Sequence, residues 1–163
     1  MNKFVITLML MVYANHGLAQ TNLHSSVNVG AGNLTFEEWM KQNKWDRLEE
    51  AIPSLLIQKE NKEKENPFNE DDYYSIVMSL HYCYVQIGDI ASTRKLLSSA
   101  MAVYNQRSSE PNTEYIRGLW LCMGQLEFTL KNFGQALAYF NQAQCMYEES
   151  NNFGEAYVGM LIN

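Results

Sequence analysis

The sequence is poor in the residues that mark several common protein classes. Its 163 residues include three cysteines, three prolines and nine glycines. No Cys-x-x-Cys pair occurs, so a zinc site and a redox motif are not supported. The small number of prolines and glycines disfavours an all-β sandwich. We expect Cys83, Cys122 and Cys145 to be free residues packed on helices, with one intramolecular or intermolecular disulfide left open.

Positive charge is also scarce, with 12 basic residues against 18 acidic ones and a net charge of -6. A chain of this charge offers no basic surface for nucleic acid or anionic lipid, so neither is expected as a partner. Apolar residues still make up 47% of the chain, which is too many for a disordered segment. Because leucine, alanine, glutamine, glutamate and methionine favour helix, the composition predicts an all-α globular protein.

The arrangements of polar residues that catalysis requires are missing as well. The sequence contains no G-x-S-x-G, no H-E-x-x-H and no glycine-rich phosphate loop. His24 lies in a segment without periodicity, and His81 falls at a packing position of an expected helix. Cys83 is two residues from His81 and would not face it, which argues against a thiol–imidazole pair. We therefore expect no enzymatic activity, metal, cofactor or small-molecule substrate.

The first 19 residues have the three-part layout of a secretory signal. Lys3 precedes an apolar run from Phe4 to Ala14, and the small residues Gly17 and Ala19 follow it. The run is about half as long as the ~20 residues that a membrane-spanning helix needs. No cysteine follows it, which argues against a lipid anchor. The pattern predicts cleavage after Ala19 and export to the periplasm or the extracellular space, with a buried N-terminal helix as the alternative.

Helical structure is expected to begin near Thr35, after a polar and flexible lead-in over residues 20–33. Thr35 and Glu38 have the spacing of a capping box, in which each side chain accepts a hydrogen bond from the other residue's backbone N–H. The box predicts a short helix from Phe36 to about Asn43.

An atypical helix pair is predicted over residues 34–59, because a second helix with apolar residues on one face starts near Trp45. Pro53 is expected to kink this helix, since its ring removes one backbone donor and clashes with the preceding turn. The mixed charges over residues 60–72 lack an apolar period and predict a solvated loop.

The strongest helical periodicity lies in the second half of the chain. It predicts four helices, over Tyr74–Gln86, Ile90–Asn105, Glu114–Leu130 and Phe133–Glu149. The connections between them are short, which predicts antiparallel neighbours.

These helices form an internal repeat, because a shift of 43 residues brings the third and fourth onto the first and second. Large apolar residues then coincide, with Leu97 on Phe140, and small ones coincide, with Ala100 on Ala143. A helix pair with an apolar face that it cannot bury alone stacks on a copy of itself. The sequence therefore predicts an α-solenoid of antiparallel helix pairs over residues 73–163, with units at 74–116, 117–155 and, in part, 156–163.

The second unit resembles the tetratricopeptide repeat in its longer form of roughly 40 residues. Trp120 and Gly124 match the tryptophan and glycine of the first helix of that motif. Its second helix has a series of aromatic residues and alanines, which is matched by Phe133, Ala136, Phe140 and Ala143. Small residues let the two helices approach closely, while Trp120 and Phe140 are expected to fill the space between neighbouring units. In the preceding unit, His81 stands at the position of the glycine.

The resemblance implies a right-handed superhelix whose first helices line a concave groove for an extended peptide or a partner helix. The residues that would line this groove are Met78, Tyr82, Leu121, Gln125, Phe128, Tyr157 and Met160. Any one of them could instead belong to the core. Apolar anchors and amide groups suit a protein or peptide partner. The expected function is thus that of an exported, non-catalytic scaffold that binds protein.

Two further expectations concern the C-terminal edge of the array. The sequence stops at Asn163, within an expected helix, so an apolar face would be left uncovered. Either a longer parent protein or self-association through this edge would cover it. The alternative function is that of the N-terminal sensing region of a larger signalling receptor or peptidase.

Overall fold

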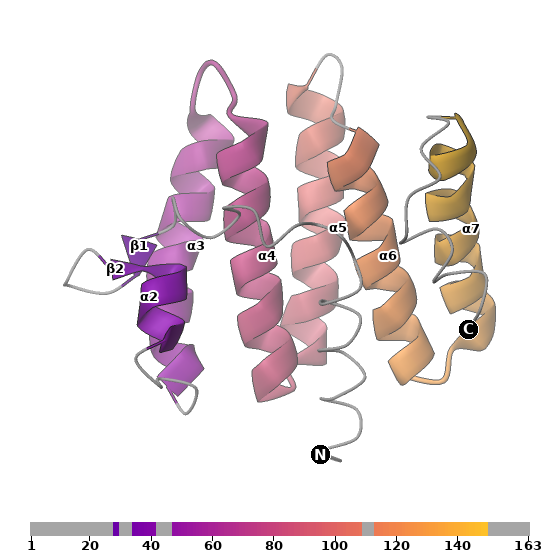
Figure 1. Cartoon of the computed structure of the whole chain (residues 1–163), viewed down its shortest axis with the longest axis horizontal. Coiled ribbons are helices and arrows are strands. Elements are labelled where there is room, and N and C mark those ends of the chain that lie inside the picture. Colours follow the sequence, from indigo (N-terminus) through magenta and orange to yellow (C-terminus); the bar gives the residue numbers. More distant parts are fainter. Residues whose placement is uncertain (1–27, 30–33, 42–46, 109–112, 150–163) are drawn as a thin grey trace. The chain divides into compact units, whose positions relative to one another are not determined.

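The structure is a computed structural model that describes residues 28–29, 34–41, 47–108 and 113–149. Its elements are β1 (Asn28–Val29), β2 (Leu34–Thr35), α2 (Phe36–Lys41), α3 (Leu48–Lys64), α4 (Glu70–Ile87), α5 (Ile90–Arg107), α6 (Thr113–Thr129) and α7 (Phe133–Glu149) (Figure 1). The prediction of an all-α protein is confirmed over these residues, apart from the short antiparallel pair β1–β2. The elements from β1 to α5 belong to one compact unit, and α6 and α7 belong to another.

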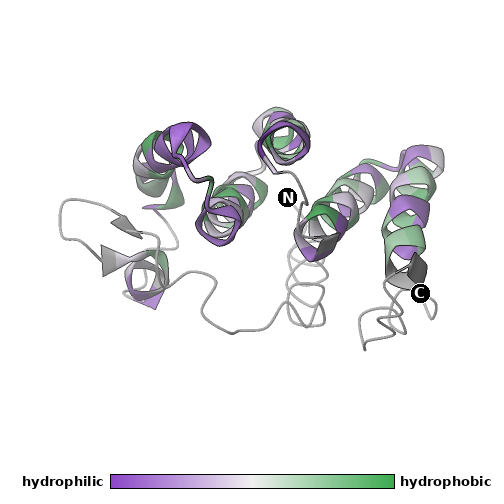
Figure 2. Ribbon diagram, turned by 90° about the horizontal axis from the view of Figure 1, so that it is seen from above, coloured by the Kyte–Doolittle hydropathy of each residue, from purple (hydrophilic) through white to green (hydrophobic). Residues whose placement is uncertain are grey.

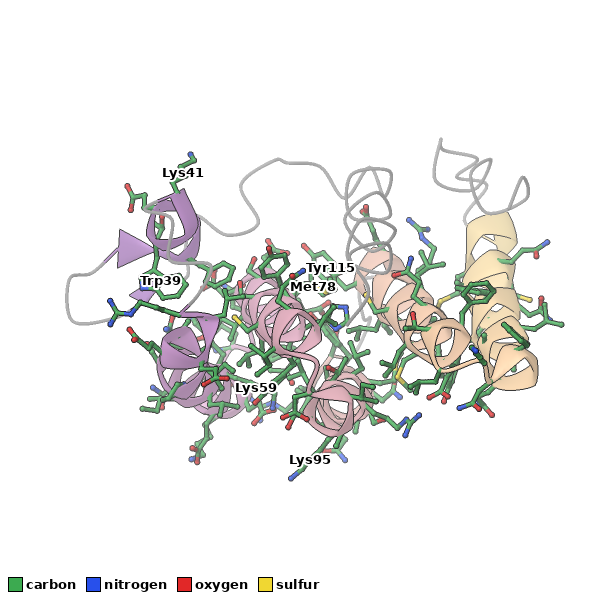
Figure 3. The ribbon with its side chains drawn as sticks, turned by 90° about the horizontal axis from the view of Figure 1, so that it is seen from below. Trp39, Lys41, Lys59, Met78, Lys95 and Tyr115 are labelled. Atoms are coloured by element: carbon green, nitrogen blue, oxygen red, sulfur yellow. The ribbon has the colours of Figure 1, made fainter. Side chains whose placement is uncertain are left out.

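The capping box at the start of α2 is confirmed. The Glu38 backbone N–H donates to the Thr35 hydroxyl oxygen over 3.1 Å, and the Thr35 N–H donates to the Glu38 carboxylate over 3.0 Å. These bonds to the ionised carboxylate hold the pKa of Glu38 below its usual value. Trp39 lies on the side of α2 that faces α3, whereas Lys41 points away (Figure 3). The expected end near Asn43 and the expected helix start at Trp45 lie outside the described residues.

The prediction of a charged loop over residues 60–72 is wrong at both ends. Helix α3 continues to Lys64, past Pro53, and α4 begins at Glu70, so that only residues 65–69 connect them. On the surface of α3, Lys64 pairs with Glu60 over 2.6 Å at a spacing of four residues, which supports the helix. The acidic first turn of α4 lies where the helix dipole favours negative charge. The kink at Pro53 stays a prediction.

The connection between α3 and α4 is held by aromatic and polar contacts from α5. Tyr104 donates to the Glu70 carbonyl over 3.0 Å, and Arg107 donates to the Glu65 carbonyl over 2.5 Å. The Arg107 guanidinium also lies 5.8 Å from the centre of the Phe68 ring. Phe68 packs against Tyr73 and Tyr104, with ring centres 5.3 and 6.0 Å away. These contacts join the C-terminal ends of α3 and α5 to the N-terminal end of α4.

Helix α4 is buried on every side over nine consecutive residues, from Tyr73 to His81. Seen nearly end on in Figure 2, it lies between α3 and α5, and it packs against both. On α2, Phe36 reaches it through an edge-to-face contact with Tyr82, at a centre-to-centre distance of 6.3 Å. A helix that is apolar all round must be covered all round. In the unit that contains it, α4 is therefore the central element.

Candidate functional site

The turn inside each helix hairpin has the same backbone hydrogen bonds in both units. Between α4 and α5, the Asp89 N–H donates to the Tyr84 carbonyl over 2.9 Å. Between α6 and α7, the Asn132 N–H donates to the Glu127 carbonyl over 2.9 Å, 43 residues further along. A bond of this kind satisfies a carbonyl at the end of a helix, as in a Schellman motif. The repeat that the sequence predicts is thus present in the geometry of the two turns.

Each turn also contains one residue in the left-handed backbone conformation, again 43 positions apart. Gly88 has φ 78° and Lys131 has φ 64°. The following helix starts in the same way in both units, because the N–H of Thr93 donates to the Asp89 carbonyl and that of Ala136 to the Asn132 carbonyl. Side chains disfavour positive φ, so the lysine is the more strained of the two.

This difference predicts opposite effects of two substitutions on stability. Lys131→Gly is expected to raise the free energy of unfolding by up to about 1 kcal/mol, because glycine adopts positive φ without a steric cost. Gly88→Lys is expected to lower it by about 1–2 kcal/mol for the same reason. Urea unfolding of both variants and of the parent chain measures the effect. If both substitutions changed the free energy of unfolding in the same direction, the cost of positive φ would not be what distinguishes the two turns.

Within the α6–α7 hairpin, the residues that match the tetratricopeptide motif come together. A Cβ atom on Gly124 would lie 2.4 Å from the nearest carbon of the Phe140 ring, so only glycine fits there. Leu121 and Ala143 form a buried cluster, and Trp120 and Phe140 pack against it. The predicted close approach of the two helices is therefore observed.

Two further motif residues also belong to this hairpin. Ala136 is buried, and Trp120 stacks on Tyr139 with ring centres 5.5 Å apart. Trp120 and Phe140 thus fill space inside the pair, and their contact with a neighbouring unit stays a prediction.

The predicted groove lining is wrong at Met78 and Leu121. Both side chains are buried, at 4% exposure each. Met78 lies in the fully covered part of α4, and Leu121 forms the cluster with Ala143. A sequence pattern separates an inner face from a core face only where polar residues mark a boundary, and these helices have few. The two residues belong to the core.

The other proposed lining residues have different surroundings. Tyr82 is half-buried against Phe36, and burial raises its pKa to about 12. Gln125 is half-buried, and Phe128 is half exposed. Tyr157 and Met160 lie outside the described residues. Phe128, near the end of α6, is thus the most accessible of the described candidates, and Gln125 lies one turn before it.

Large apolar side chains are exposed at seven described positions, which are Leu56, Ile57, Ile87, Ile90, Phe128, Phe133 and Leu137. Three of them belong to the α6–α7 hairpin, where the Phe128 and Phe133 rings meet edge to face at 5.5 Å. The sequence matches Phe133 to the aromatic series of the motif, and Leu137 is not among the residues singled out from the sequence. The spacing of four residues between them was the available signal, since it places both on one row of a helix.

Burial shifts the pKa values of one histidine and two cysteines. Burial lowers the pKa of His81 to about 4, so its imidazole is neutral near pH 7. Burial raises the pKa of the Cys83 and Cys122 thiols to about 12, which keeps them protonated and poorly reactive. Both are free and packed in the interior, as expected.

Cys145 differs from the expectation, because its side chain is exposed and does not act as a packing residue. It is free as well. Over the described parts of the chain, no group of three or more histidine, cysteine or acidic residues could hold a metal ion.

No described helix has the length and apolar character needed to cross a membrane. Comparison of the chain with protein-family models, curated proteins and solved structures finds no significant match.

Proposed function

We propose that this protein is a scaffold of stacked helix hairpins, similar to tetratricopeptide-repeat proteins, that binds a protein or peptide. The observation that carries the proposal is the repetition of one hairpin design at a spacing of 43 residues. The first residues of the helices, the left-handed turn residue and the hydrogen bonds of the turn all recur at this spacing. A recurring unit of this kind supports a solenoid, in which each hairpin packs its apolar face on the next.

The binding surface that we propose is the C-terminal half of α6, where Gln125 and Phe128 are accessible. Phe128 is 50% exposed and offers an aromatic anchor for an apolar side chain. Gln125, one turn earlier, has an amide that can donate to and accept from a peptide backbone. The buried positions Met78 and Leu121 do not take part, so this surface is smaller than the groove that the sequence suggested.

Export is part of the same proposal and depends on residues 1–19, which lie outside the described residues. Cleavage after Ala19 would leave a chain that begins at Gln20. The proposed scaffold is non-catalytic, which agrees with neutral His81 and the protonated buried thiols. The alternative, a sensing region of a larger receptor or peptidase, stays a prediction that the reading frame downstream of Asn163 tests.

Selection of binders from a random peptide library tests the proposed surface. We expect the parent chain to enrich peptides with large apolar residues. Phe128→Asp should weaken binding of a selected peptide at least ~10-fold, because it removes the anchor and places a charge in its position. The control is Leu56→Asp, which changes an exposed apolar residue of α3 in the same way. Equal binding by the parent and both variants would refute the proposal for this surface.

A further inference from the structure

Helix α7 has an exposed row of residues that the proposed peptide binding does not use. Phe133, Leu137, Asn141 and Cys145 follow one another at a spacing of four, and all four are exposed. The two large apolar side chains of this row, Phe133 and Leu137, are 58% and 61% exposed. Residues four apart lie side by side on a helix surface. We call these four residues the α7 stripe.

The α7 stripe lies on a segment without charge, although the chain has a net charge of -6. From Phe133 to Met146 the helix contains no acidic or basic residue. Other helices expose charged side chains: Glu60 and Lys64 on α3, and Arg94 and Lys95 on α5, where Lys95 points outward (Figure 3). Two copies of an acidic protein repel each other least where they meet through an uncharged face. The stripe is therefore suited to contact with a molecule of the same charge.

The order of the side chains along the stripe also suits self-pairing. In an isologous contact about a two-fold axis, each residue of one copy meets a fixed partner in the other. If two α7 helices run antiparallel with the two-fold axis at the middle of the stripe, Phe133 faces Cys145 and Leu137 faces Asn141. Each large side chain then meets a smaller one, which favours close packing. A parallel pair would instead place Phe133 on Phe133.

From this arrangement we infer that a second copy of this chain covers the α7 stripe, with the two α7 helices antiparallel. The inference does not depend on the proposed peptide binding. A helix of 17 residues is about 25 Å long and about 10 Å wide, so the contact buries roughly 500 Å² in total. Stable complexes bury about 1,200–2,000 Å². The dimer is therefore weak and forms only at high protein concentration.

Sedimentation equilibrium of the full chain over a range of concentrations tests the inference. We expect a reversible monomer–dimer equilibrium whose dissociation constant lies in the range of about 10 µM to 1 mM. Phe133→Glu with Leu137→Glu should raise this constant at least ~10-fold, because the charges repel across the axis. The matched control is Leu56→Glu with Ile57→Glu, which adds the same two charges at exposed apolar positions of α3. Circular dichroism verifies that each variant is folded.

Three outcomes of this experiment would overturn the inference. The parent chain could remain monomeric at millimolar concentration. Both double variants could weaken association equally, which would indicate unspecific apolar contact. Removal of residues 150–163 could strengthen association, which would mean that this segment covers the stripe. Because the Phe133 ring contacts Phe128, with ring centres 5.5 Å apart, the single variant Leu137→Glu separates the two proposals: it should weaken association and leave peptide capture unchanged.

A distance between spin labels at Cys145 tests the antiparallel arrangement. Cys145 is the exposed cysteine, while Cys83 and Cys122 are buried, so a thiol reagent labels it selectively. The two labels are expected roughly 20–30 Å apart, from the rise along α7 and the usual spacing of packed helices. A distance near 10 Å between the labels would indicate parallel helices. If no distance shorter than about 40 Å were observed, the α7 helices would not be in contact. Either result contradicts the inference.

Discussion

Gly124→Ala is expected to lower the free energy of unfolding by about 1–3 kcal/mol, although alanine favours helix more than glycine does. The added Cβ would lie 2.4 Å from one carbon of the Phe140 ring and 2.6 Å from another. An aromatic ring cannot bend away, so the two helices must separate. Denaturant unfolding measures this loss of free energy. The control is a check that the secondary structure of the variant is intact.

A second substitution at Phe140 checks that this ring is the cause. The preceding unit has His81 and Leu97 at the positions of Gly124 and Phe140, so a larger residue on the first helix goes with a smaller one on the second. Phe140→Leu in the Gly124→Ala background should therefore restore part of the stability. In a double-mutant cycle the two changes should be non-additive by about 1 kcal/mol or more. Additive losses would show that the close approach is not what Gly124 provides.

The stability of the protein is expected to fall as the pH decreases from 6.5 to about 4, because of His81. Burial lowers its pKa to about 4 in the folded chain, while the unfolded chain keeps the ordinary value of 6.5. Between these values the unfolded state binds a proton that the folded state does not, so acid favours unfolding. The slope is about 1.4 kcal/mol per pH unit, which gives about 3 kcal/mol over the whole interval.

His81→Gln separates this effect from the titration of carboxylates. Glutamine does not titrate, and the acidic groups of the protein are the same in both chains. The difference in unfolding free energy between the parent and the variant should change with pH between 6.5 and 4, and be constant above pH 7.5. A difference that does not depend on pH would show that His81 is accessible to protons in the folded state.

The sequence predicted the helix hairpins closely where local signals mark their ends. Helix α7 has the predicted bounds, Phe133 to Glu149, and α5 begins at the predicted Ile90. In both cases a turn residue with positive φ precedes the helix, and an aspartate or asparagine follows that residue. The capping box at Thr35 was predictable for the same reason, since its bonds span three residues.

Features that depend on distant residues could not be predicted in this way. The connection at residues 65–69 is contacted by Arg107, which lies 42 positions from Glu65 and bonds to its carbonyl, and no local pattern shows this contact. Met78 was assigned to a surface because tetratricopeptide repeats have a groove there, but α4 is covered on every side. This helix has apolar residues on all of its faces, so its sequence does not show which face would be exposed to solvent. The charges at residues 60–64 predict a loop by their composition, whereas the spacing of four between Glu60 and Lys64 also suits a helix.

The central proposal is that the α4–α5 and α6–α7 hairpins are copies of one unit, which a solenoid would stack on each other. A crystal structure of the full chain tests it most directly. The account predicts that one rotation and translation superposes the first hairpin on the second, with Gly88 on Lys131 and Leu97 on Phe140. It also predicts that α5 and α6 pack as antiparallel neighbours about 8–10 Å apart. Hairpins that superpose but share no packed face, or whose turns differ, would contradict it.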